Sequence, residues 1–210
     1  IDDVELAREL NAVGLPGVSD RLKAEEVDTA EVGLKSEWLD HRVRVEASLY
    51  DTTQKNAPYF VFVGAITAQV LVPIDKVDLY GGEFTITANL APGLDAFAGY
   101  GYTHSEIKAY ALVPGDVGHR APYVPNATVD GGLQYRVPIT STLRLFRRIQ
   151  YQRLGEQYWD PENSTARDPV NLVGGRLGVE IMDNHWSVIG TIYNACDKRD
   201  NSEWGSGGYA

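Results

Sequence analysis

Hydrophobic and polar side chains alternate at every second position along most of the chain from Ala30 onward. The pattern is clearest in residues 94–137, where two alternating runs flank a long polar loop that contains three prolines. In the second run the two faces differ in character: Val129, Leu133 and Tyr135 oppose Asp130, Gln134 and Arg136. A period of two predicts β-strands that have unlike surroundings on their two sides.

About eight such runs follow one another, at residues 30–38, 43–63, 76–89, 94–103, 128–137, 143–154, 170–181 and 186–194. Short turns near Asp40, Pro92, Ile139 and Asn184 alternate with longer loops that carry Pro and Tyr. A soluble sandwich has no reason to separate short from long connections so regularly. Because ~9 to 11 residues per strand suffice to cross a bilayer, we expect an all-β fold, an antiparallel up-and-down transmembrane β-barrel segment.

Aromatic residues near the strand ends are predicted to form two bands, as amphipathic rings do at the two membrane interfaces. The expected band at the short turns comprises Trp38, Trp186, Tyr135 and Phe97, and the band at the long loops comprises Tyr59, Tyr102, Tyr158 and Trp159. Cross-strand packing of rings within an ordinary sheet would not sort them by height.

Composition and charge narrow the possible functions. The formal net charge of -10 argues against a nucleic-acid partner, because 29 Asp+Glu outweigh 19 Lys+Arg. One cysteine, Cys196, excludes an internal disulfide, and four scattered histidines lack metal-ligand spacing, so we expect no metal site and no cofactor. His104 and Ser105 are neighbours on one strand without a triad pattern, and we expect the protein not to be an enzyme.

Short motifs occur in a set order along the chain. They are Glu31-Val32-Gly33-Leu34-Lys35-Ser36, Leu79-Tyr80-Gly81-Gly82-Glu83, Gly99-Tyr100-Gly101-Tyr102-Thr103, Gly132-Leu133-Gln134-Tyr135 and Tyr193-Asn194-Ala195-Cys196-Asp197-Lys198-Arg199. In order and spacing they resemble the C-terminal part of the β-barrel of TonB-dependent outer-membrane receptors of the siderophore-receptor type.

This resemblance implies a larger, 22-stranded barrel in the outer membrane of a Gram-negative cell, filled by an N-terminal plug through which the TonB complex acts. We therefore expect an extracellular loop region with a short helix at residues 1–28, the transmembrane barrel segment at 29–204 and the start of a terminal loop at 205–210. The plug and the last strand are expected to lie outside this sequence. The implied function is active uptake of a ferric siderophore or similar metal chelate, and the implied partners are that ligand and outer-membrane lipid.

The ligand is expected to bind the long loops. Their rings and cations suit an anionic, aromatic chelate: Tyr110, His119, Arg120, Tyr123, Tyr158, Trp159 and Arg167. Loop packing is an alternative role for each of these residues.

Two other functions are compatible with the pattern. One is a passive or structural outer-membrane β-barrel protein without active transport. The other is a soluble β-sandwich binding module, which would fold without detergent because it has no exposed apolar band.

Arg147 interrupts an otherwise apolar strand face formed by Leu143, Leu145, Ile149 and Tyr151. An arginine costs ~2–4 kcal/mol at the bilayer midplane and ~0–1 kcal/mol near an interface. Either the register shifts at this residue, or its guanidinium group extends to the interface.

Overall fold

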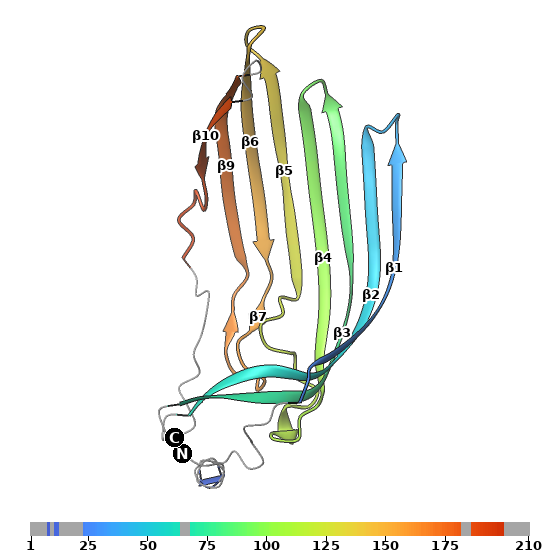
Figure 1. The fold of residues 1–210 in the computed structure, drawn as a ribbon, viewed down its shortest axis with the longest axis vertical. Coiled ribbons are helices and arrows are strands. Elements are labelled where there is room, and N and C mark those ends of the chain that lie inside the picture. The colour runs from blue at the N-terminus through green and yellow to red at the C-terminus, as the bar shows by residue number, and fades with distance from the viewer. Residues whose placement is uncertain (1–7, 9–10, 13–22, 64–67, 182–185, 200–210) are drawn as a thin grey trace.

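The computed structural model describes residues 8, 11–12, 23–63, 68–181 and 186–199 of the 210-residue chain. One antiparallel sheet has eight strands in sequence order (Figure 1). They are β1 (Glu26–Trp38), β2 (Val43–Val63), β3 (Ala68–Ala91), β4 (Leu94–Ala109), β5 (Ala127–Pro138), β6 (Leu143–Leu154), β9 (Val170–Ile181) and β10 (Trp186–Ile192). A small second sheet pairs β7 (Gln157–Tyr158) with β8 (Ala166–Arg167), and Pro114–Asp116 form a 3-10 turn, η2. The predicted all-β, up-and-down antiparallel architecture is confirmed.

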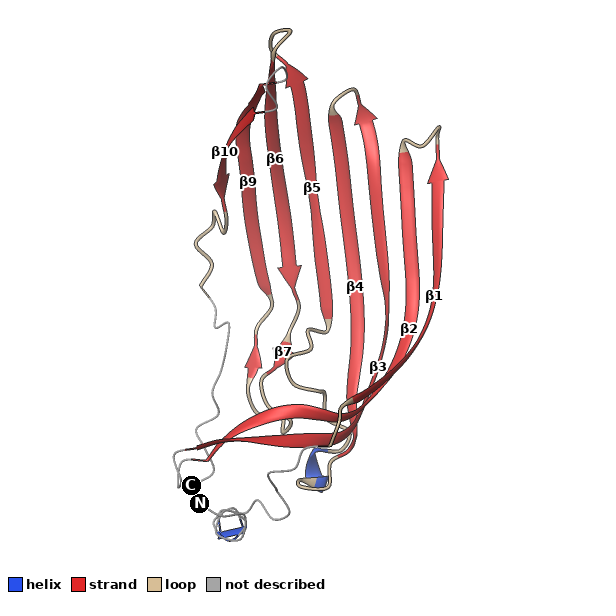
Figure 2. Cartoon of the chain, viewed as in Figure 1, coloured by secondary structure: helices blue, strands red, loops and turns tan. Residues whose placement is uncertain are grey.

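Short and long connections lie at opposite ends of the sheet (Figure 2). The short turns predicted near Asp40, Pro92 and Ile139 are present, and the one near Asn184 lies outside the described residues. In the β3–β4 turn Gly93 has a φ of +78°, and a Cβ there would lie 2.0 Å from the carbonyl oxygen of Arg136. Only glycine fits so close to the neighbouring strand in this backbone conformation.

The β2–β3 hairpin is longer than the sequence predicts. We expected the third strand to begin at Lys76, but β3 begins at Ala68 and pairs with β2 along its whole length. Asn56 has a φ of 55°, and the pairing is interrupted there without a change of register, since Lys55 pairs with Lys76 and Ala57 with Ile74. Beyond Asn56 the hairpin bends and runs across the end of the sheet (Figure 1).

The cross-strand register sorts side chains into two unlike faces. One row runs Ala96, Leu133, Ile149, Gly175 and Ile192, and the next row runs Asp95, Gln134, Arg148, Arg176 and Thr191. We call the first the apolar face and the second the polar face. Large side chains on the apolar face are exposed, and Val188 keeps 74% of its surface accessible. Soluble proteins rarely expose so extended an apolar surface, so this face is suited to contact lipid.

Ion pairs and contacts between arginines and aromatic rings lie on the polar face. Glu37 Oε1 accepts a hydrogen bond of 2.7 Å from Arg44 Nη2, and Glu180 lies 3.5 Å from Arg136 and 3.6 Å from Arg144. The Arg148 guanidinium lies 4.5 Å from the centre of the Phe97 ring. The prediction that Phe97 joins a membrane band is therefore wrong, because alternation along β4 turns it to the polar face.

The expected domain boundaries remain predictions. In the first 22 residues only 8, 11 and 12 are described, and these are helical. Residues 205–210 lie outside the described part. Among the described residues, no helix combines the length and apolar character needed to cross a bilayer.

Candidate ligand-binding site

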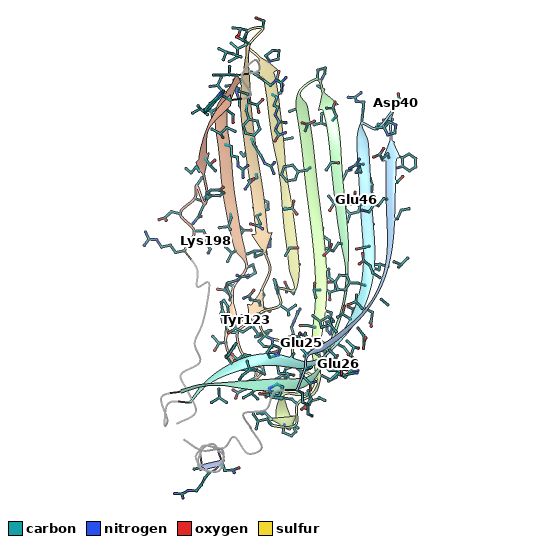
Figure 3. The ribbon with its side chains drawn as sticks, viewed as in Figure 1. Glu25, Glu26, Asp40, Glu46, Tyr123 and Lys198 are labelled. Carbon is teal, nitrogen blue, oxygen red and sulfur yellow. The ribbon has the colours of Figure 1, made fainter. Side chains whose placement is uncertain are left out.

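Three connections pack together at the long-loop end of the sheet. They are the far part of the β2–β3 hairpin (56–63 and 68–75), the β4–β5 loop (110–126) and the β6–β9 loop (155–169). We call this assembly the cap. All seven residues that the sequence nominates for ligand binding lie in it, at the opposite end of the sheet from Asp40 (Figure 3, where Tyr123 marks the cap).

The cap has a hydrophobic core of its own. Its buried members are Ala57, Tyr59, Val72, Ile74, Val77, Ile107, Tyr110 and Ala121. They come from the hairpin, from the ends of β3 and β4 and from the β4–β5 loop, so residues as far apart in the chain as Ala57 and Ala121 meet in this core. The Tyr59 hydroxyl also donates a 3.3 Å hydrogen bond to the carbonyl oxygen of Trp159, 100 positions along the chain. Such a core fixes the relative positions of the connections.

Polar contacts join the β4–β5 loop to the β6–β9 loop. Asn163 Oδ1 accepts a hydrogen bond from the Arg120 backbone N–H at 2.9 Å, and Asn163 Nδ2 donates to the Arg120 carbonyl at 2.9 Å. His119 Nδ1 lies 3.1 Å from the Pro161 carbonyl oxygen. The Asp160 carboxylate accepts hydrogen bonds from the backbone N–H groups of Ser164 and Thr165. The nominated residues His119 and Arg120 are thus part of the junction between loops.

Three aromatic rings form the centre of the cap. The Tyr123 ring lies 5.6 Å from the Trp159 ring, edge to face, and 6.5 Å from the Tyr59 ring. Tyr123 has a φ of 63°, and its backbone N–H donates to the Tyr158 carbonyl at 2.8 Å. Trp159 is only 2% exposed, whereas Tyr123 is 48% exposed. Trp159 therefore supports the ring of Tyr123, and the Tyr123 side chain is partly exposed.

The other nominated residues are less accessible. Tyr110 is buried in the cap core, and Tyr158 and Arg167 are half-buried on the paired strands β7 and β8. Arg120 Nη2 donates to the Thr103 carbonyl at 3.0 Å. Arg167 Nη2 lies 3.4 Å from the Gly155 carbonyl, but its Nε is buried and finds no acceptor among the described residues. A buried donor of this kind favours an added acceptor.

The expected aromatic band is also corrected here. Tyr59 and Trp159 were assigned to the interface at the long loops, but both are buried inside the cap. Tyr102 is exposed on the apolar face, and its place in an interface band stays a prediction. The hairpin bends at Asn56, so Tyr59, although still paired with Val72 of β3, packs inside the cap. The local alternation does not reveal this bend.

Acidic groups lie at one side of the cap. Burial raises the pKa of the Asp116 carboxyl, and the neighbouring Glu162 adds to that shift, while His119 opposes it. Asp116 Oδ1 lies 3.9 Å from His119 Nδ1. Within the described part of the chain, no group of three or more His, Cys, Asp or Glu side chains is placed to hold a metal ion.

Sequence reasoning missed Asn163 and Asp160. Both belong to the segment Asp160-Pro161-Glu162-Asn163, in which Asp and Asn side chains bond nearby backbone groups and Asn163 has a φ of 58°. Asp-Pro followed by Asn is a turn signal that could have identified the local bonds. It could not have revealed that Asn163 also bonds Arg120.

Comparison with known proteins shows what the fold is similar to. Residues 8–195 match the family model described as TonB dependent receptor-like, beta-barrel. The probable TonB-dependent receptor BfrD of Bordetella pertussis is 28% identical over 191 residues, which are 89% of this chain and 25% of that protein. The chain thus spans about a quarter of the length of this curated relative.

Solved structures share the sheet. The ferric yersiniabactin uptake receptor FyuA from Yersinia pestis superposes with a TM-score of 0.70 at 19% identity, over 88% of this chain and 27% of that one. The copper transporter OprC superposes with a TM-score of 0.66 at 13% identity, over 91% of this chain and 30% of that one. Identities this low show a shared fold and do not identify the ligand.

Proposed function

The chain belongs to the TonB-dependent receptor-like β-barrel family, and from that premise we propose that it forms part of a receptor that takes up a ferric siderophore or similar metal chelate. Members of this family are outer-membrane transporters of Gram-negative bacteria and not enzymes. For this chain, the outer membrane of a Gram-negative cell is the proposed location, with lipid against the apolar face and the barrel interior against the polar face.

The observation that carries the ligand-binding part is the exposed Tyr123 ring on a packed support. The neighbouring Trp159 is buried, and the backbone N–H of Tyr123 donates a hydrogen bond to the Tyr158 carbonyl in the β6–β9 loop. These two contacts hold the Tyr123 ring in one place. A ring already fixed before binding loses little conformational entropy when a planar ligand stacks on it. Arg167, with its buried Nε lacking an acceptor in the described part, adds a donor for an anionic group.

Uptake would also require partners beyond these residues. Energy from the TonB complex would reach the barrel through a plug domain of the whole receptor. Similarity to FyuA, a ferric yersiniabactin uptake receptor, supports iron chelates as the ligand class. OprC has the same fold and is a copper transporter, so the fold alone does not select an iron chelate.

Binding of ferric chelates to the purified protein in detergent micelles tests this proposal. We expect saturable binding of at least one catecholate or phenolate chelate, and about two- to tenfold weaker binding by Tyr123→Ala, the range expected for one aromatic contact. Tyr135→Ala, on the apolar face, is the matched control and should bind as the wild type does. Absence of saturable binding would favour a passive barrel, and equal loss in both variants would remove Tyr123 from the site.

A further inference from the structure

Arg147 is a cation on the apolar face, where its neighbours along β6 are Leu145 and Ile149. It pairs with Tyr135 of β5 and Leu177 of β9, and the register is continuous through it. The register therefore does not shift, and the side chain is exposed on the apolar face. No hydrogen bond or ion pair joins it to another described residue. Its neighbour Arg148, on the polar face, differs in that it stacks on Phe97.

An apolar groove adjoins this arginine. The groove has a volume of about 630 Å³, a floor at Gly175 and Gly190, and walls that include Ile149, Leu177 and Ile192. Leu177 is both a wall of the groove and the cross-strand partner of Arg147. The cation and the groove are therefore parts of one surface feature with a polar end and an apolar body.

The feature has a direction relative to the sheet. Arg147 is four residues from the first residue of β6, Leu143, at the short-turn end. At about 3.3 Å per residue this is about 13 Å along a tilted strand. The groove extends from Leu177 toward Val173 and Ala195, away from the short turns. A long arginine side chain can reach toward the interface while the groove runs toward the bilayer centre.

We propose that Arg147 and this groove bind one anionic glycerophospholipid of the leaflet next to the short turns, with its phosphate on the guanidinium group and an acyl chain in the groove. Arginine binds phosphate through two parallel hydrogen bonds. No carboxylate lies on the apolar face of β5, β6, β9 or β10 among the described residues, so nothing there would pair with the ammonium of a zwitterionic headgroup. Phosphatidylglycerol is therefore preferred over phosphatidylethanolamine. The inference rests on the membrane location in the proposed function, and does not depend on ligand uptake.

The test uses the protein in nanodiscs with equal amounts of phosphatidylglycerol and phosphatidylethanolamine, followed by native mass spectrometry of the lipids that stay bound. Wild type should retain phosphatidylglycerol preferentially. Arg147→Gln should lower this preference about fivefold, the factor for one charge at an anionic lipid surface. Arg147→Lys should keep most of it.

Two further variants separate the charge from the groove. Gly190→Val should reduce retention of both lipids, because a Cβ there has its nearest contact at 3.7 Å and the larger side chain would fill the groove. Arg153→Gln is the control, since Arg153 is on the same strand and face but bonds Asn171 at the other end. Thermal melts in the same discs check that each variant is folded.

Distinct results overturn distinct claims. An Arg147→Gln protein that keeps the full phosphatidylglycerol preference overturns the lipid site, as does an equal loss in Arg153→Gln. Insertion without any lipid preference overturns the lipid site alone. A protein that does not enter the bilayer overturns the proposed membrane location as well.

Discussion

The wall of the sheet and the cap at its end are continuous in the chain but differ in how they are stabilised. In the wall, side chains of the apolar face remain accessible, with Leu34 64% exposed. In the cap, Ile107 is 0% exposed and packs among residues of the β2–β3 hairpin and the β4–β5 loop. The cap thus makes a hydrophobic core within the protein, whereas the wall requires an apolar solvent for one of its faces. One sheet therefore depends on two kinds of surroundings.

Shortening one side chain in each region should give the largest contrast. Ile107→Ala leaves a cavity in the cap core and should lower the free energy of unfolding by about 2–5 kcal/mol. Leu34→Ala on the apolar face should cost less, because lipid or detergent chains close around the shorter side chain and leave no cavity. Denaturant unfolding in micelles measures both. Equal losses would mean that the cap has no core separate from the wall.

A glycine of the wall tests the packing of its polar face. A Cβ at Gly132 would lie 2.4 Å from the Ile149 carbonyl oxygen and 2.8 Å from the Phe97 ring. Gly132→Ala should therefore cost about 1–3 kcal/mol, as overpacked positions do. Gly131→Ala is the control, because its Cβ faces the apolar side and has its nearest contact at 3.3 Å. If the two variants unfold at the same denaturant concentration, the Phe97 ring does not pack closely against Gly132.

The smallest expected effect is a pH dependence confined to the cap. Because burial raises the pKa of Asp116, the folded cap binds this proton more tightly than the unfolded chain does. The resulting stability is complete below about pH 4, the ordinary value for aspartate, and is lost as pH rises through the raised pKa. Asp116→Asn should therefore slow hydrogen exchange of the Gly118 amide at neutral pH and flatten its pH dependence. The exposed Asp168→Asn is the control, and a steeper pH dependence in Asp116→Asn would contradict the assignment.

Alternation along the chain was sufficient to predict the wall. Residues such as Leu133 and Gln134 fall on opposite faces in any strand, so the up-and-down sheet and its two faces follow from local sequence. Phe97 was misplaced because the next two residues on its face, Gly99 and Gly101, have no side chains that would mark the face as polar or apolar. The motif order, more than any single residue, pointed to the family that the comparison then matched.

The cap could be predicted only as a set of loops. Its core depends on contacts such as that between Tyr59 and Trp159, which are 100 positions apart. The bend that brings the hairpin across depends on a left-handed conformation at Asn56, which local sequence favours only weakly. Sequence reasoning therefore nominated residues of the correct region, but did not separate the exposed Tyr123 from the buried Trp159.

The division between two faces of the wall is tested most directly by spin labels at three successive positions of β5. Single cysteines at Leu133, Gln134 and Tyr135, in a Cys196→Ser background, would carry the labels in a reconstituted bilayer. We predict high collision rates with oxygen, which dissolves in lipid, at 133 and 135, and with a water-soluble nickel complex at 134. Equal values at all three positions, or the reverse order, would contradict a wall with lipid on its apolar face.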